Sequence, residues 1–541
     1  MFTLNSRLTK LLSASALVFT GAAFLTAQNA QPPAQRGPTF RTGARLVVVD
    51  VVVANDSGPI RGLTKEDFTL EDKGKKQEIA VFASTEVKNS ETPQPLPPGV
   101  VSNKINSKGE EFSSATVILY DRANTAAIDQ AFVRSQVLKL LAALKPTDKV
   151  GFYSLGSELK VVNDFNNEAG PLVAAAKRLE SNSGTEGLPA PEAAMLRALS
   201  SALSPMQELS NQARVDITRT AFRSIARHLA GVPGRKNLVW VVSRFPLTYG
   251  NAQERATQDE AEVQTFTNNL TEANITVFPV DPGGTGAGFA TSEGAPTADA
   301  TILGSKGRGA GSAGVGGSSL TGNQSFQKIA SATGGKAFRN SNDIGPALNE
   351  VVQSGAISYT LGYYPDEKSL DDKVHKIDVK IAKKPALDKA KATFRKEYVA
   401  WGPQSGPEVR PRPFLSEVME ESVDATGVGL VGAAKPDPAK PGFHQLDVRV
   451  SISDLDFQQR ADQWVGAFDM IVTLDGQKNG QVEPFNLVWT QNEYLGALQG
   501  GLIVGKSIQT SGTNGVLRVV LQDKVTGVVG SIRVPFVSPK P

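Results

Sequence analysis

Residues 116–126, TVILYDRANTA, indicate the architecture of the central part of the chain. Its first five residues are apolar or β-branched and predict a short buried strand, which Asp121 follows directly. Apolar residues then recur with the spacing of one helical face at Val133, Val137, Leu140, Leu141 and Leu144. A strand that leads into a helix predicts the first unit of an α/β sheet.

The same alternation continues toward the C-terminus. Further strands are predicted at residues 149–155, 158–162, 237–242 and 275–280, with helical patterns between most of them. This order predicts an α/β fold, a doubly wound and mostly parallel sheet at residues 114–355 with helices on both faces. Residues 283–322 hold 13 glycines and are expected to form a long loop.

Strand-like segments flank this domain. Residues 41–87 and 356–400 are each too short for a stable sheet, so we expect them to pair as one β domain, with the α/β domain inserted between them. The Pro-containing segments 88–113 and 402–442 are predicted to be linkers, and the second leaves room for one strand. Period-two patterns dominate residues 443–541 and predict a C-terminal β-sandwich.

Composition and the N-terminus narrow the class of protein. The chain has 57 Lys and Arg against 54 Asp and Glu, which disfavours a nucleic-acid-binding protein. It has no Cys and only three His, so thiolate chemistry is excluded and zinc chemistry has few ligands. Arg7 and Lys10 precede an apolar run at residues 11–27, which predicts a signal peptide at residues 1–30. We therefore expect an exported protein, periplasmic or secreted, with no membrane span after cleavage.

Polar residues occupy the ends of the predicted parallel strands. Ligands of such sheets bind in the crevice beyond the carboxyl ends of the strands. The sequence predicts a ligand-binding crevice formed by Asp121, Asn124, Thr125, Asn163, Asp164, Ser243 and Asp281. Oxygen ligands without His or Cys suit a hard cation such as Mg²⁺ or Ca²⁺, whereas Asn124 and Thr125 are also good helix caps.

The segments TVILYDRANTA, KVGFYSL, RKNLVWVVS and ITVFPVD resemble the von Willebrand factor type A domain. The flanking strings ARLVVVDVVVANDSGPIRGLTKEDFTLEDKGKKQEIAVF and AISYTLGYYP resemble the exported type A-related proteins of acidobacteria. The resemblance covers roughly residues 41–401. It implies a doubly wound parallel sheet and protein binding through a metal-ion-dependent adhesion site.

That site uses an Asp-x-Ser-x-Ser motif, a distant Thr and a distant Asp. Asp121 and Thr125 match the first and last motif positions, but Ala123 stands at the middle one. The distant Thr falls near Asn163, and the distant Asp falls at Ser243. The resemblance therefore implies a degenerate site in which Asp121 and Thr125 either hold Mg²⁺ or another divalent cation weakly or only cap a helix. No cofactor is firmly predicted.

The other polar and aromatic residues do not point to catalysis. No Ser has the flanks of a nucleophile elbow, and His228, His375 and His444 are expected at the surface or at strand edges. The aromatic residues indicate either cross-strand packing or a sugar- or peptide-binding platform; they are Tyr359, Tyr363, Tyr364, Trp464 and Trp489. The leading hypothesis is an exported, non-enzymatic adhesion protein that binds a protein or peptide at the crevice. The alternatives are a scaffolding component of the cell envelope with a vestigial crevice, and an enzyme acting on an envelope polymer.

Overall fold

The structure of the chain is a computed structural model. It describes residues 46–56, 58–86, 96–105, 114–125, 127–142, 150–166, 204–232, 234–243, 245–246, 263–264, 266–268, 270–271, 273–281, 322–338, 345, 351–352, 357–400, 415–477, 480–510 and 514–537. The chain divides at Gly43, and all described residues belong to the larger unit, residues 44–541. The predicted signal peptide and almost all of the glycine-rich loop lie outside the described residues. None of the described helices is long and apolar enough to span a membrane.

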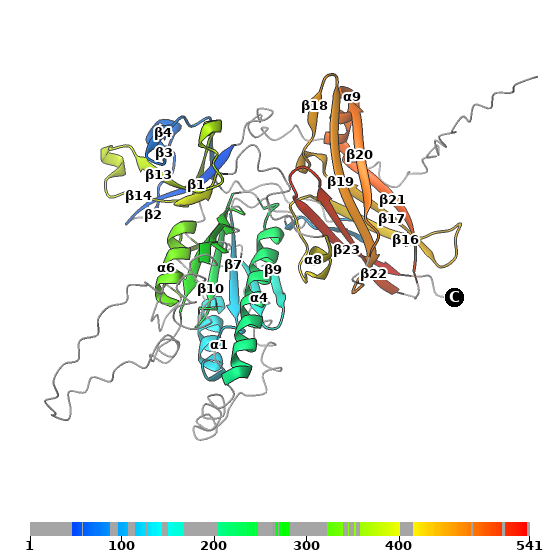
Figure 1. The fold of residues 1–541 in the computed structure, drawn as a ribbon, viewed down its shortest axis with the longest axis horizontal. Helices are drawn as coiled ribbons and strands as arrows, with labels where there is room; N and C mark the ends of the chain where they lie inside the picture. Colours follow the sequence, from blue (N-terminus) through cyan, green and yellow to red (C-terminus); the bar gives the residue numbers. More distant parts are fainter. Residues whose placement is uncertain are drawn as a thin grey trace, which may run out of the picture. The chain divides into compact units, whose positions relative to one another are not determined.

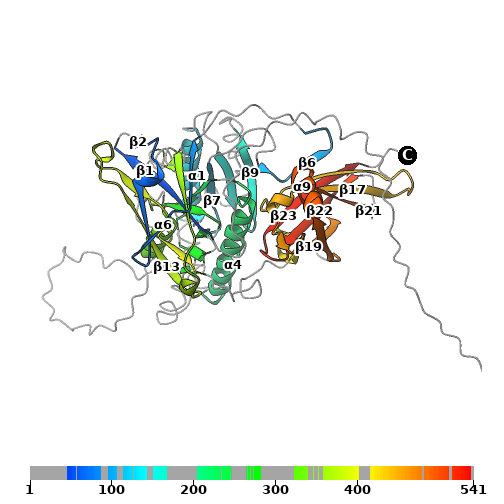
Figure 2. The same cartoon turned by 90° about the horizontal axis from the view of Figure 1, so that it is seen from above.

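A mixed sheet forms the central α/β domain, in the order β11-β10-β7-β8-β9. Its strands are β7 (Ser114–Asp121), β8 (Val150–Leu155), β9 (Leu159–Asn166), β10 (Arg235–Val241) and β11 (Ile275–Val280). Four of them run parallel, and β9 is antiparallel to its neighbour β8. The helices are α1 (Ala127–Ala142), α4 (Ser204–His228) and α6 (Gly322–Thr333), seen along the sheet in Figures 1 and 2.

Alternate residues of the central strands face two separate apolar cores. Val117 and Trp240 pack with Phe222 of α4 in one core, whereas Ile118 and Val239 pack with α1 in the other. Because successive strand residues point to opposite faces, helices cover both faces of the sheet. The strands consequently read as continuous apolar runs, the pattern from which the sequence predicted them.

The flanking segments form two sheets that share one core. The first has the order β14-β1-β12-β5, with β2 beside β1, and the second has the order β15-β13-β3-β4. The strands and 3-10 helices are β1 (Val47–Asn55), β2 (Gly58–Pro59), η2 (Lys65–Asp67), β3 (Phe68–Asp72), β4 (Lys75–Gln77), β5 (Val81–Glu86), β12 (Ile357–Tyr363), η5 (Glu367–Ser369), β13 (Val374–Ile381), η6 (Pro385–Leu387), β14 (Lys391–Thr393) and β15 (Glu397–Val399). The pairs β1–β12 and β3–β13 join the segments on either side of the α/β domain.

A second pair of sheets forms the C-terminal part, around a core that includes Val448, Phe468 and Val534. The orders are β21-β17-β16-β6 and β18-β19-β22-β23, with β20 paired to β19. The elements are β6 (Val100–Ser102), α8 (Leu415–Glu420), β16 (Leu430–Pro436), β17 (Phe443–Val450), η7 (Ile452–Asp454), β18 (Gln458–Arg460), β19 (Gln463–Leu474), β20 (Glu483–Thr490), α9 (Gln491–Gly500), β21 (Leu502–Gln509), β22 (Asn514–Asp523) and β23 (Val529–Val537).

Two of these strands lie in segments that the sequence predicted as linkers. Residues 100–102 form β6 and pair with β16, which itself begins at Leu430. The linker prediction for 88–113 is corrected accordingly, whereas the prediction for 402–442 already allowed one strand. β6 is too short to show a period-two pattern, and β16 has Gly and Ala at its centre, where a strand prediction relies on β-branched residues.

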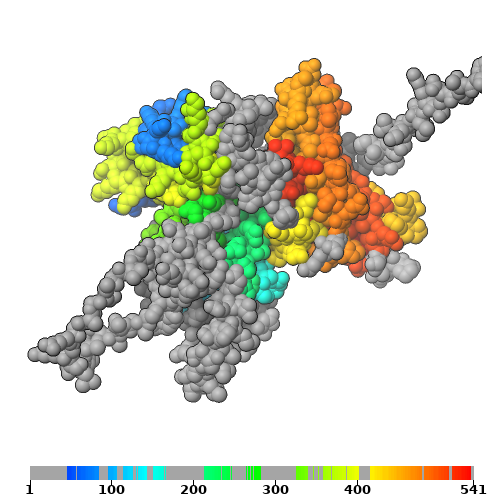
Figure 3. Space-filling model, viewed as in Figure 1, coloured from blue at the N-terminus to red at the C-terminus, as the bar shows by residue number. Residues whose placement is uncertain are grey.

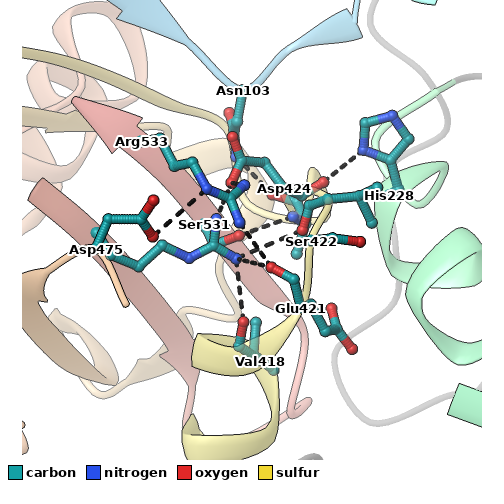
Figure 4. Close-up of polar contacts among 12 residues, drawn as sticks. Asn103, His228, Val418, Glu421, Ser422, Asp424, Asp475, Ser531 and Arg533 are labelled. Carbon is teal, nitrogen blue, oxygen red and sulfur yellow. Dashed lines mark hydrogen bonds and ion pairs between the residues drawn. The ribbon is translucent and has the colours of Figure 1, made fainter. Parts of the chain in front are cut away.

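A polar cluster attaches the α/β domain to the C-terminal sheets (Figure 4). We name it the Asp424 clamp and define it as Asp424, Glu421, Arg227, Arg518 and Arg533. Arg518 is fully buried and donates to the Asp424 carboxylate and to the carbonyl oxygens of Val418 and Glu421 at 3.1 and 3.2 Å. Arg533 also donates to Asp424, at 2.8 Å.

The end of α4 supplies the other half of this attachment. Arg227 forms an ion pair with Glu421, and His228 Nδ1 lies 2.6 Å from the carbonyl oxygen of Asp424. Thr426 Oγ1 donates to the carbonyl oxygen of His228 at 2.6 Å. The segment between α8 and β16 is therefore fixed on both sides by hydrogen bonds.

Candidate functional site

Asp121 lies at the carboxyl end of β7 and is completely buried. One carboxylate oxygen accepts the backbone N–H of Asn124 at 3.0 Å. The other accepts from Asn124 Nδ2 at 2.8 Å and from Trp240 Nε1 at 2.9 Å. Both oxygens are thus occupied by N–H donors of the same chain.

Asn124 links this carboxylate to helix α4. Its Nδ2 group also donates to Thr218 Oγ1 at 2.8 Å, so both amide hydrogens are used. Its Oδ1 atom is buried and accepts no hydrogen bond within the part of the chain that the structure describes. We name Asp121, Asn124, Thr218 and Trp240 the Asp121 network.

Thr125 and Ser243 lie beside this network and are also buried. Thr125 Oγ1 donates to the backbone carbonyl of Asp121 at 2.6 Å, which helps to close the turn that precedes α1. Ser243 Oγ lies 3.5 Å from the carbonyl oxygen of Asn124, the long limit for a hydrogen bond. The structure therefore brings together four of the seven predicted crevice residues: Asp121, Asn124, Thr125 and Ser243.

Burial raises the pKa of Asp121 from 3.8 to about 6. The hydrogen bonds from Asn124 and Trp240 favour the ionised carboxylate and oppose this shift, but desolvation outweighs them. The groups that oppose desolvation are neutral N–H donors, with no Lys or Arg among them.

This donor set does not fit a divalent cation. Such a cation needs several free oxygens, but the N–H groups of Asn124 and Trp240 already occupy the Asp121 carboxylate. Ala123, at the middle motif position, packs against the apolar core instead of offering a hydroxyl. The orphaned Oδ1 of Asn124 is a single neutral oxygen. Among the described residues, no group of three or more His, Asp or Glu side chains could hold a metal ion.

The remaining predicted crevice residues lie elsewhere or make other contacts. Asn163 pairs with Phe152, three residues before Leu155, the residue of β8 that pairs with Asp121. Because β9 is antiparallel, it leads away from the carboxyl ends of the parallel strands, so Asn163 lies away from the edge at which Asp121 stands. The side chain of Asp164 lies outside the described residues. Asp281 follows β11, and its backbone N–H donates to the carbonyl oxygen of Phe338 at 2.9 Å.

Sequence reasoning missed Trp240 and Thr218. Trp240 lies within a buried strand and Thr218 within a helix, so neither stands at a strand end. The available signal was that a buried indole N–H needs an acceptor, and Asp121 is on the adjacent strand.

The three histidines are buried, which corrects the expectation that they lie at the surface or at strand edges. His375 lies between Asp72 and Asp371, with ring nitrogens 3.0 and 2.9 Å from their carboxylates. His444 lies 2.9 Å from Thr510 Oγ1, and His228 contacts the Asp424 clamp.

The two tryptophans of the C-terminal part favour packing over a binding platform. Trp464 and Trp489 are directly opposed on β19 and β20. Both are partly buried and pack at the edge of the C-terminal core. Their position matches the cross-strand packing that the sequence offered as one of two interpretations.

Comparison with known proteins gives only weak structural likenesses. No protein-family model and no curated protein matches the sequence. An aerotolerance-related membrane protein from Bacteroides fragilis is 12% identical, with 45% of this chain and 98% of that chain covered and a TM-score of 0.25. BatB from Bacteroides thetaiotaomicron is 14% identical, with 44% and 96% covered and a TM-score of 0.24.

A von Willebrand factor type A protein from Catenulispora acidiphila is 9% identical, with 93% of this chain and 76% of that chain covered and a TM-score of 0.24. At these TM-scores the likenesses support no inference about function. The description of the fold therefore rests on the strand order and packing of this chain alone.

Proposed function

We propose that the chain is an exported, non-enzymatic interaction protein in which a type A-like, doubly wound α/β domain is carried on β-sandwich modules. Helices on both faces of the sheet and a polar network at the carboxyl end of β7 support this architecture. The apolar run at residues 11–27 supports export.

The observation that carries the proposal is the occupation of both Asp121 oxygens by N–H donors. A carboxylate that is buried and satisfied in this way stabilises the turn between β7 and α1 and offers nothing to a cation. The chain therefore binds its partner without a metal ion, and the partner contacts surfaces other than the Asp121 carboxylate. This favours a vestigial adhesion site over a degenerate but working one.

The burial of the three histidines disfavours an enzyme. The ring of His375 is held between two carboxylates, whereas His228 is buried beside the Asp424 clamp and His444 in the C-terminal sheets. A general base must reach the proton that it removes, and none of the three rings is exposed to a substrate. The second candidate function is a scaffolding component of the cell envelope. In that case the C-terminal sheets would make the contacts with other envelope components.

Three measurements test the proposal. Calorimetric titration of the full chain with Mg²⁺, Mn²⁺ and Ca²⁺ should show no saturable heat, and Asp121→Asn should give the same result. Cross-linking of the immobilised chain to envelope proteins of its source should give the same products in Mg²⁺ and in EDTA. Saturable cation binding that Asp121→Asn abolishes, or cross-links lost in EDTA, would overturn metal-independent binding. Turnover of an envelope polymer by the pure chain would overturn the non-enzymatic hypothesis.

A further inference from the structure

Strand β20 has one unpaired side. It pairs with β19 over its full length, from Glu483 opposite Met470 to Thr490 opposite Gln463. No other strand in the described part of the chain pairs with it. Its backbone N–H and C=O groups on the open side are therefore available to another strand. The surrounding C-terminal sheets form the orange and red surface in Figure 3.

The open side has few of the features that usually prevent edge pairing. β20 contains no Lys or Arg, its register with β19 has no shift, and Pro484 is only its second residue. Val488 is 53% exposed on its outer face. Its single charged residue, Glu483, forms an ion pair with Lys506 of β21. The only charge on this eight-residue edge strand is already paired, so the edge can accept another strand that carries no unpaired charge.

β20 is complementary to itself. In an antiparallel pair centred on Leu487, Phe485 lies opposite Trp489 of the partner subunit. Directly opposed residues point to the same side of a sheet, so the half-buried row of Phe485, Leu487 and Trp489 continues across the pair. Glu483 falls beyond the end of the paired segment, and no two like charges are opposed. Centring the pair on Asn486 instead places Glu483 opposite Trp489 of the partner subunit.

We propose that the occupant of this edge is a second copy of the chain, joined by antiparallel β20 pairing about a two-fold axis at Leu487. The two copies then form one continuous sheet. This goes beyond the proposed function, and it is tested without any other partner.

The test uses two exposed positions that this register brings together, Asn486 and Val488. Light scattering should give the full chain twice its monomer mass at high concentration. Asn486→Lys/Val488→Lys opposes like charges and should give a monomer. Asn486→Lys/Val488→Glu opposes unlike charges and should retain the dimer. Ile503→Lys, at a 52% exposed position on the edge strand β21, is the matched control and should also remain dimeric.

A second measurement uses the absence of cysteine from the sequence. The Leu487→Cys variant has a single thiol, which should form a disulfide-linked dimer on mild oxidation, whereas Ile503→Cys should not. A monomeric wild-type chain at every concentration would overturn the proposal. A dimer that persists in Asn486→Lys/Val488→Lys would overturn β20 as the interface, and a monomeric Asn486→Lys/Val488→Glu variant would overturn the register.

Discussion

The Asp121 network and the Asp424 clamp hold their carboxylates in opposite ways. Asp121 is completely buried among neutral donors, and desolvation raises its pKa. Asp424 is partly exposed and accepts from two guanidinium groups, those of Arg518 and Arg533. The first network fixes one turn of the α/β domain, whereas the second joins two parts of the chain.

The difference shows how each network contributes to stability. A carboxylate with neutral donors costs free energy when it ionises, so its contribution depends on pH. A buried guanidinium that satisfies a carboxylate and several carbonyl groups leaves many groups unpaired when it is removed. The clamp should therefore be the more sensitive of the two to substitution.

Arg518→Met should produce the largest effect. It removes the donors to Asp424, Val418 and Glu421 from a buried position, and the expected loss is about 3–5 kcal/mol of unfolding free energy. Urea denaturation measures it, and exposed Arg460→Met is the control, with a change within about 0.5 kcal/mol. A variant as stable as this control would show that the clamp does not hold the C-terminal sheets.

Asp121→Asn should change the pH dependence of stability. Because the folded pKa is raised, the contribution of Asp121 is fully present below its unfolded pKa of 3.8 and is lost as pH rises through about 6. The unfolding free energy of the wild type, relative to the variant, should fall by about 3 kcal/mol across this window. Urea denaturation at a series of pH values tests this, with exposed Asp462→Asn as control. A difference that does not vary with pH would contradict the buried, raised-pKa carboxylate.

The sequence allowed prediction of the parts of these networks that are local. Asp121 follows a buried strand, and Asn124 caps the turn three residues later, so their proximity depends on a few bonds. Trp240 and Thr218 reach Asp121 and Asn124 from 119 and 94 residues away, and no local pattern reports such contacts. Asn163 was misplaced because the second strand of a hairpin runs back from the edge at which the parallel strands end.

The clamp could not be predicted for a related reason. Arg518 lies within an alternating strand pattern, where a charged residue normally faces solvent, and it is buried because α8 and the following segment cover it. That segment lay in a predicted linker at residues 402–442. Prediction of strands and helices therefore succeeded where periodicity was strong, and failed where a contact depended on distant segments.

Thr218→Val should change the unfolding free energy less than Arg518→Met or Asp121→Asn. It removes the acceptor for Asn124 Nδ2 and a donor to the carbonyl oxygen of Arg214, at an expected cost of about 1–2 kcal/mol. Thr218→Ser keeps the hydroxyl and is the matched control in urea denaturation. If the two variants were equally destabilised, the methyl group and not the hydrogen bond would account for the loss.

Ser243→Ala should produce the smallest effect, within about 0.5 kcal/mol. Its hydroxyl lies 3.5 Å from the carbonyl oxygen of Asn124, a contact too long to contribute much, although it occupies the position that the family resemblance assigns to a distant carboxylate. Urea denaturation beside Thr218→Val measures the difference. A loss as large as that of Thr218→Val would place Ser243 within the Asp121 network. A negligible loss of unfolding free energy would show that Ser243 does not belong to the Asp121 network, although it is a polar residue at a strand end. The network then depends on the two carboxylate oxygens of Asp121 and the N–H groups that donate to them.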